Sequence, residues 1–221
     1  MEIGVVSDVH ANRVALDAVL DAMPDVDLLV NAGDVVGYNP WPAACVERVR
    51  ELGMPTVVGN HDRATARSGP VRFNAMANAG VDHARTRLSD EQRSWLADLP
   101  DRRTVADGRV RIVHGHPENP DRYTYPEEFS PAMLDGEALL VTGHTHVQGH
   151  RRFDEGTVMN PGSVGQPRDG DPRAAYALVD LETSPPTVDE RRVEYDVGRV
   201  VEAVEAAGLP RRIGERLREG R

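Results

Sequence analysis

Short motifs built from aspartate, asparagine and histidine recur along this chain, and most of them directly follow an apolar run. In chain order they are Asp8-Val9-His10, Gly33-Asp34, Gly59-Asn60-His61-Asp62, His114-Gly115-His116, Gly143-His144-Thr145-His146 and Asn160-Pro161-Gly162-Ser163. Their side chains offer carboxylate and amide oxygens and imidazole nitrogens, but no thiolate. A mixed oxygen and nitrogen donor set suits Mn²⁺, Fe or Zn²⁺, and it argues against a structural zinc site of the cysteine type.

Some of these side chains form a candidate ligand set that is too large for one transition metal ion with an open coordination position. The set consists of Asp8, His10, Asp34, Asn60, His114, His144 and His146. Two ions would use all of them if one carboxylate bridged the ions. Side chains two residues apart in an extended segment point the same way, so the pair at 8 and 10 and the pair at 144 and 146 can each converge on one ion.

Two divalent ions whose only anionic protein ligands are two aspartates keep a net positive charge. Such a centre attracts a phosphate ester and stabilises the charge that grows on its oxygens during attack. It also lowers the pKa of a bound water to about 7. The donor set therefore predicts hydrolysis of phosphate esters.

The elements that would position these motifs alternate between strands and helices in the first part of the chain. Buried strands are predicted over 3–7, 28–30 and 56–58. Helices are predicted over 12–23 and 42–52, the first with Asn12 as its N-cap and Pro24 after its end. This order indicates βαβ units, in which ligands collect beyond the carboxyl ends of the strands.

The rest of the chain is predicted to contain a capped helix, a hairpin, further strands and C-terminal helices. Ser89 is expected to open a helix that ends before Pro100, and the hairpin over 104–113 is expected to turn at Asp107-Gly108. Strands are predicted over 138–141, 149–153, 157–159, 174–180 and 187–195, a helix over 196–207, and a loose helix over 209–221. The expected fold class is α/β: one domain over 1–221, built as a four-layer αββα sandwich of two mixed sheets flanked by helices.

The charge balance bears on the partners of the protein. The chain has 221 residues and a formal net charge of −10, and all of its basic residues are arginine. An acidic, lysine-free composition is typical of GC-rich coding and also of adaptation to high salt, and both explanations remain open. It argues against a stable nucleic-acid complex, because sequence-independent binding uses a basic surface.

Cysteine usage and hydropathy bear on the compartment. Cys45 is the only cysteine, so no intramolecular disulfide is expected. The N-terminal residues show no signal-peptide pattern, and no apolar run approaches the roughly 20 residues of a membrane-spanning helix. We therefore expect a cytoplasmic protein that does not associate with a membrane.

Taken in order, the motifs resemble those of the calcineurin-like metallophosphoesterase superfamily, from Asp8 to about Arg168. The pattern Asp-x-His, Gly-Asp, Gly-Asn-His-Asp/Glu, His and Gly-His-x-His is met without a gap. The segment over 160–168 is similar to that of the small bacterial and archaeal phosphodiesterases of this superfamily. The resemblance implies that Asp8, His10 and His146 hold one metal ion, that Asn60, His114 and His144 hold the other, and that Asp34 bridges them.

The resemblance also implies roles for residues outside the ligand set. His61 would be the catalytic residue, which donates a proton to the leaving oxygen or binds the phosphate, and Asp62 could orient it. Arg168 could bind the substrate phosphate or form a structural ion pair. Apart from the resemblance, His116 follows Gly115 just beyond the candidate ligand His114, so it could face either the pocket or the surface.

The expected function is that of a di-metal phosphoesterase, first of all a phosphodiesterase that hydrolyses small phosphate esters by attack of metal-bound hydroxide. The expected cofactors are two divalent transition metal ions, with Mn²⁺ ahead of Fe and Zn²⁺, and the expected partner is a small phosphate-ester substrate. A non-catalytic scaffold or interaction module on the same fold, a nuclease and a protein phosphatase are the alternatives. Aromatic residues near the motifs could stack on a base, although packing of the loops is the simpler interpretation: Tyr38, Trp41, Tyr123 and Tyr125.

Overall fold

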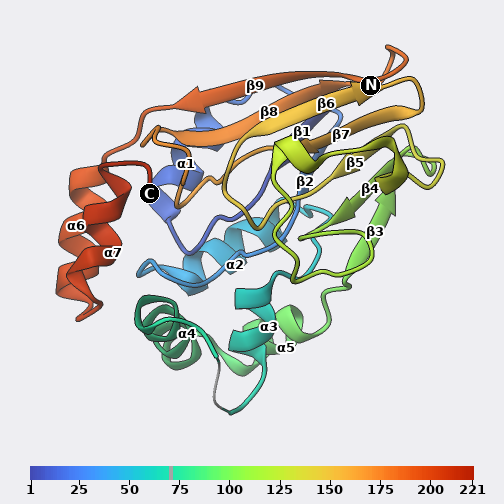
Figure 1. The fold of residues 1–221 in the computed structure, drawn as a ribbon. Helices are drawn as coiled ribbons and strands as arrows, with labels where there is room; N and C mark the ends of the chain where they lie inside the picture. Colours follow the sequence, from blue (N-terminus) through green and yellow to red (C-terminus); the bar gives the residue numbers. More distant parts are fainter. Residues whose placement is uncertain (70–71) are drawn as a thin grey trace.

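Two β-sheets lie face to face at the centre of the protein, and most of the helices gather beside them (Figure 1). The structure is a computed structural model that describes residues 1–69 and 72–221. Within these ranges, no helix has both the length and the apolar character needed to cross a bilayer. The helix pair near the C-terminus lies apart from the others, at the left of the view.

The first sheet has the strand order β2-β1-β8-β9. Its strands are β1 (Glu2–Val6), β2 (Leu28–Asn31), β8 (Ala174–Asp180) and β9 (Thr187–Val193). β1 runs parallel to β2 and antiparallel to β8, and β8 is antiparallel to β9. The sheet is therefore mixed, and β1 and β2 end at the same edge.

The second sheet has the order β3-β4-β5-β7-β6. Its strands are β3 (Arg102–Val105), β4 (Val110–Val113), β5 (Leu139–Val141), β6 (Gly149–Phe153) and β7 (Gly156–Asn160). The outer pairs are antiparallel, whereas β4, β5 and β7 are parallel to one another. The predicted hairpin joins β3 to β4, and Asp107 and Gly108 at its turn have positive φ, as the sequence indicated.

A continuous apolar layer joins the two sheets. Ile3 and Val5 of β1 belong to one buried cluster with Ile112 of β4 and Val141 of β5. Val6, one residue further along β1, belongs instead to the cluster under the helices. This alternation follows from the two-residue repeat of a strand, and it shows that β1 is covered on both faces.

Helices cover the outer face of the first sheet. α1, α2, α5 and α6 begin and end near the predicted residues, whereas α3 and α4 were not predicted as helices. The α-helices are α1 (Arg13–Ala22), α2 (Pro42–Glu51), α3 (Asn60–Ala66), α4 (Ala75–Arg87), α5 (Asp90–Ala97), α6 (Val197–Ala206) and α7 (Arg211–Leu217). Asn12 caps α1 by accepting a hydrogen bond from the Ala15 amide at 3.1 Å. Ser89 and Gln92 form a capping box at the start of α5.

Two short 3₁₀-helices, η1 (Pro126–Glu128) and η2 (Pro131–Met133), lie over the outer face of the second sheet. Phe129 and Met133 pack there against Leu140 and Val158. The prediction of two mixed sheets flanked by helices is confirmed, with these short turns as the outer layer of the second sheet.

The predicted third strand over 56–58 is wrong. Thr56 forms a single parallel bridge with Asn31, and the chain then turns directly into α3. Pairing cannot extend toward the N-terminus of this segment because Pro55 has no amide hydrogen to donate. Residues 57–59 have no regular secondary structure, and α3 begins at the candidate ligand Asn60.

The C-terminal segment is also more ordered than predicted. α7 was expected to be a loose helix, but Ile213 and Leu217 are fully buried. Both belong to the same apolar cluster as Val200 and Val204 of α6 and the ring of Tyr38. Since Ile213 and Leu217 are four residues apart, they lie on one face of α7.

Candidate metal centre

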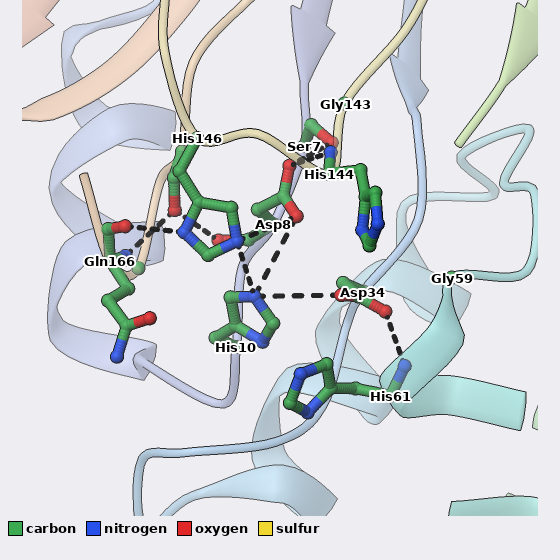
Figure 2. Close-up of polar contacts among 12 residues, drawn as sticks. Ser7, Asp8, His10, Asp34, Gly59, His61, Gly143, His144, His146 and Gln166 are labelled. Atoms are coloured by element: carbon green, nitrogen blue, oxygen red, sulfur yellow. Dashed lines mark hydrogen bonds and ion pairs between the residues drawn. The ribbon is translucent and has the colours of Figure 1, made fainter. Parts of the chain in front are cut away.

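The candidate ligands meet where parallel strands of the two sheets end. Asp8 follows β1 and Asp34 follows β2, whereas His114 follows β4 and His144 follows β5. Because the sheets pack face to face, these four strand ends lie together, and Figure 2 shows several of their side chains pointing toward one another. Of the seven candidate ligands, all but Asn60 are buried.

The first cluster consists of Asp8, His10 and His146, whose possible ligand atoms lie within 4.8 Å of one another. The Nε2 atom of His146 is 3.2 Å from Oδ1 of Asp8 and 3.0 Å from Nε2 of His10. The Nε2 atom of His10 is 3.7 Å from Oδ1 of Asp8. The three residues that were assigned to the first metal ion are thus brought together (Figure 2).

The second cluster consists of Asn60, His114 and His144. The ligand atoms of His114 and His144 lie within 4.8 Å of one another and of Asp34. Oδ1 of Asn60 is 3.2 Å from Nε2 of His114. The structure therefore also brings together the residues that were assigned to the second metal ion.

Asp34 lies between the two clusters. Its Oδ2 atom is 3.6 Å from Nε2 of His10 and 3.4 Å from Nε2 of His114. Its other oxygen accepts a hydrogen bond of 2.8 Å from the backbone amide of His61. One carboxylate oxygen thus faces both clusters, which is the arrangement that a bridging ligand requires.

The tautomers of three histidines are fixed by backbone carbonyl groups. Nδ1 of His10, His114 and His146 lies 3.0 Å, 2.8 Å and 2.6 Å from the carbonyl oxygens of Val36, Ala32 and Gln166, respectively. A carbonyl oxygen only accepts hydrogen bonds, so each Nδ1 carries the hydrogen. Nε2 of His10 and of His146 then presents a lone pair to the first cluster, as is usual for a metal-binding histidine held by an outer partner. Nε2 of His114 faces Oδ2 of Asp34 and Oδ1 of Asn60, and it presents a lone pair once its proton is lost.

Several buried hydrogen-bond acceptors of the centre have no donor as a partner. The lone pairs of His10 Nε2 and His146 Nε2 face each other across 3.0 Å, which is repulsive unless a cation lies between them. Oδ1 of Asp8 and Nε2 of His144 are buried and accept no hydrogen bond. Unpaired buried acceptors are costly, so this donor set fits a pair of bound cations.

Burial sets the protonation of most of these histidines. It lowers the pKa of His10 and of His146, and it lowers the pKa of His144 to about 4. These rings are therefore neutral at pH 7, which is the form that binds a metal ion. Burial also acts to lower the pKa of His114, but the negative charge of Asp34 outweighs it and raises that pKa to about 9. A bound cation would displace this proton.

Most of the ligands lie in a backbone conformation that residues other than glycine seldom adopt. Positive φ angles between 46° and 69° occur at Asp8, His10, Asp34, His144 and His146. Such residues cost about 1–3 kcal/mol each and occur preferentially at functional sites. Asp8 and His10 converge on one cluster as predicted, but the prediction is wrong for His144 and His146, which enter different clusters. Left-handed turns, rather than extended segments, direct these side chains.

Two glycines are required by close approach of the chain to the ligands. A Cβ atom on Gly59 would lie 2.0 Å from Oδ1 of Asp34, and one on Gly143 would lie 2.1 Å from Oγ of Ser7. Ser7 in turn donates a hydrogen bond of 2.7 Å to Oδ2 of Asp8, which leaves Oδ1 of Asp8 for the cluster (Figure 2). The sequence did not single out Ser7.

Replacing Gly59 with alanine is expected to displace the Asp34 carboxylate and to lower both metal occupancy and turnover. A displacement of about 1 Å in a catalytic centre can cost about 100-fold in rate. Metal occupancy is measured as the metal content after dialysis. Turnover is measured as the rate of hydrolysis of an aryl phosphodiester. Gly198→Ala in α6, where the added atom meets only the Asp196 side chain at 3.3 Å, is the matched control. Normal metal content in Gly59→Ala would contradict this account.

Asp62 does not orient His61, contrary to the expectation. Its two carboxylate oxygens accept hydrogen bonds of 3.1 Å from the backbone amides of Val36 and Gly59. The reason is that α3 begins at Asn60, so Asp62 in its first turn reaches back to the start of the helix. Asp62 thereby ties the loop after Asp34 to the helix that carries Asn60.

His61 is buried beside the clusters and is held by aromatic rings. Its ring centroid is 4.7 Å from that of Tyr38 and 4.8 Å from that of Phe73, with interplanar angles of 39° and 28°. Its Nδ1 atom has no hydrogen-bond partner. The ring also lies close enough to His10 and Asp34 to serve as a ligand, so the geometry is compatible with both a catalytic and a metal-binding role.

The two candidate substrate-binding residues lie outside the clusters. Nδ1 of His116 accepts a hydrogen bond of 3.2 Å from the amide of Glu118, in a turn beyond β4. Arg168 donates to the hydroxyl of Tyr38 at 3.2 Å and to Oε1 of Gln166 at 2.8 Å. Within residues 1–69 and 72–221 it forms no ion pair with a carboxylate, so the alternative of a structural ion pair does not hold. Arg168 instead supports the Tyr38 ring that packs on His61.

The comparisons with known proteins agree with this geometry. A family model described as the calcineurin-like phosphoesterase superfamily domain matches residues 1–184. The chain therefore belongs to the calcineurin-like phosphoesterase superfamily. The superfamily is metal-dependent, and the two clusters supply residues that can bind metal ions.

Individual relatives extend the similarity over the whole chain. The crystal structure of a metallophosphoesterase from Sphaerobacter thermophilus is 36% identical, with a TM-score of 0.87, and covers 100% of this chain and 99% of its own. Uncharacterized protein MJ0912 of Methanocaldococcus jannaschii is 32% identical over 99% of this chain and 98% of its own length. Phosphodiesterase YfcE of Escherichia coli is 27% identical over 81% of this chain and 88% of its own length.

Proposed function

We propose that this protein is a di-metal phosphodiesterase that hydrolyses small phosphate esters. The observation that carries the proposal is the position of Asp34, whose Oδ2 atom lies 3.6 Å from His10 of the first cluster and 3.4 Å from His114 of the second. The similarity to phosphodiesterase YfcE supports the choice of a diester over a monoester substrate.

The two clusters support a proposed set of ligands for each ion. Asp8, His10 and His146 would hold one ion, Asn60, His114 and His144 the other, and Asp34 would bridge them. When bound, two divalent ions supply an activated water as the nucleophile and positive charge for the phosphoryl oxygens. The oxygen and nitrogen donors, without sulfur, favour Mn²⁺, with Fe and Zn²⁺ as the other candidates.

Other groups of the chain would bind the substrate phosphate and hold the ligand carboxylates in place. His61 borders the clusters and would either hydrogen-bond a phosphoryl oxygen or give a proton to the leaving oxygen. The backbone amide of His61 holds Asp34, and Ser7 holds Asp8, so both carboxylates present a fixed oxygen. Fixed donors and acceptors lower the cost of reorganisation during the reaction.

Removal of metal is expected to abolish the activity reversibly. The purified protein is dialysed against a chelator, and hydrolysis of bis(p-nitrophenyl) phosphate is measured before and after addition of Mn²⁺. The proposal predicts turnover only with metal. Absence of metal-dependent turnover under all metal additions would favour the scaffold alternative. Cleavage of a DNA oligomer faster than of the small diester would favour the nuclease.

A further inference from the structure

A cleft of about 650 Å³ opens beside the second cluster. Its lining includes Asn60, His61 and His144 from the metal centre, and it extends along α3 to the start of α4. A phosphate ester bound at the metal centre would therefore place one of its organic groups in this cleft. The chemistry of the lining shows which kind of group fits.

Two aromatic rings cover the histidines that border the cleft. The ring of Tyr123 stacks on His144 with centroids 4.0 Å apart and an interplanar angle of 30°. The ring of Phe73 stacks on His61 at 4.8 Å and 28°. Both rings line the cleft, and Tyr123 is 48% exposed. A large ring that is already held by one neighbour loses little freedom when a second planar group stacks on it.

Ion pairs fix the loop that carries Tyr123. Asp121, two residues earlier, pairs with Arg63 of α3 at 2.9 Å, and Arg63 also pairs with Asp101 at 2.7 Å. The Arg63 side chain is 19% exposed, but the carboxylates of Asp121 and Asp101 are 64% and 68% exposed, so solvent screens both pairs. The Tyr123 loop is thereby fastened to the helix that begins with the ligand Asn60.

The charged residues of the cleft are mostly cationic, although the whole chain has a net charge of −10. The charged lining residues are Arg63, Arg67, Arg72, Arg85 and Asp121. Arg63 is paired with Asp101 and Asp121, and Arg85 with Asp82, so the excess positive charge comes from Arg67 and Arg72. A local excess of positive charge in a concave surface raises the local concentration of anionic ligands. The cleft thus combines aromatic surface with a preference for anions.

On the basis of the proposed phosphodiesterase function, we propose that this cleft is the subsite for the aromatic base of a nucleotide-type phosphate ester. The phosphate lies at the metal centre, and the base stacks on Tyr123. Tyr123 is then a specificity-determining residue, because it distinguishes esters that carry a planar aromatic group from esters that do not.

Two product-like ligands isolate the contribution of the base. Adenosine 5′-monophosphate and ribose 5-phosphate carry the same phosphate on the same sugar, and they differ only in the adenine. Their affinities for the Mn²⁺-loaded protein are measured by isothermal titration calorimetry. Stacking of one base on an aromatic side chain is expected to make the adenosine ligand bind about 10-fold more tightly.

Three substitutions test whether the difference in affinity between the two ligands comes from the ring of Tyr123. Tyr123→Ala is expected to remove the preference for the adenosine ligand, whereas Tyr123→Phe keeps the ring and should keep it. Tyr125→Ala is the matched control, since Tyr125 is 39% exposed on the same loop but is absent from the lining of the cleft. Its ring centroid is 6.5 Å from that of Tyr123.

Each outcome decides the proposal. Equal affinities of the two ligands for the wild-type protein, or a preference that survives in Tyr123→Ala, would overturn the subsite. Loss of the preference in Tyr125→Ala would place the base outside the cleft and would also overturn it. Hydrolysis of bis(p-nitrophenyl) phosphate by the wild-type protein keeps the two proposals apart: if it depends on metal while adenine gives no advantage, only the subsite is wrong.

Discussion

Replacing Asp34 with asparagine is expected to remove both metal ions and to lower turnover by at least about 1000-fold. The substitution removes the negative charge from the oxygen that faces His10 and His114 at 3.6 Å and 3.4 Å. Metal ions contribute several kcal/mol to stabilisation of the transition state, and each 1.36 kcal/mol corresponds to tenfold in rate. Metal content by mass spectrometry and the rate with bis(p-nitrophenyl) phosphate measure the two effects.

Asp8→Asn is the matched control for this experiment, because Asp8 belongs to the first cluster alone. Asp8→Asn is expected to weaken the binding of one ion and to leave the other ion bound. If Asp34→Asn and Asp8→Asn each lose a single ion, Asp34 does not bridge the two clusters. If Asp34→Asn keeps both ions with normal affinity, the di-metal assignment fails at its shared ligand.

His61→Ala is expected to lower turnover by about 100- to 10,000-fold while two ions remain bound. A positioned acid or hydrogen-bond donor typically contributes a factor of this size. His61 is 5% exposed and borders the cleft, and it also lies close enough to His10 and Asp34 to be a ligand. Measuring the rate together with the number of bound ions therefore separates the two roles.

His150→Ala serves as the control for His61→Ala, since His150 pairs with Glu190 at 2.7 Å on the edge strand β6. It should change neither the rate nor the metal content. Loss of an ion in His61→Ala would make His61 a ligand. An unchanged rate with both ions bound would exclude His61 from the reaction.

The strand ends were predictable because strand and ligand signals coincide in the sequence. The apolar runs before Asp8, Asp34, His114 and His144 are short, and each is followed within three residues by a motif of candidate metal ligands. Parallel strands of a sheet end at the same edge, so convergence of these side chains followed from the pattern. The structure confirms that Asp8, His10 and His146 form one cluster and that Asp34 lies beside His114 and His144.

Local backbone geometry was harder to predict from the sequence. Residues 56–58 have the composition of a strand, but Pro55 has no amide hydrogen to extend the pairing, and only one bridge to Asn31 forms before α3 begins at Asn60. Asp62 looked like a partner of His61 because the two are adjacent. A helix that starts at Asn60 makes Asp62 a cap instead, and adjacency alone does not reveal where a helix begins.

Contacts between distant segments could not be predicted from one sequence. The stacking of Tyr123 on His144 depends on how the loop after β4 folds back over the site. The role of Ser7 depends on the approach of Gly143, which is 136 residues away in the chain. The burial of Ile213 and Leu217 depends on their packing with α6 and Tyr38, since their own segment is strongly charged.

Anomalous diffraction from crystals of the Mn²⁺-loaded protein tests the central claim most directly. We predict two peaks in the centre shown in Figure 2, one among Asp8, His10 and His146 and one beside His114 and His144, with Oδ2 of Asp34 bound to both ions. A single peak, or two ions that do not share Asp34, would contradict the proposed di-metal centre.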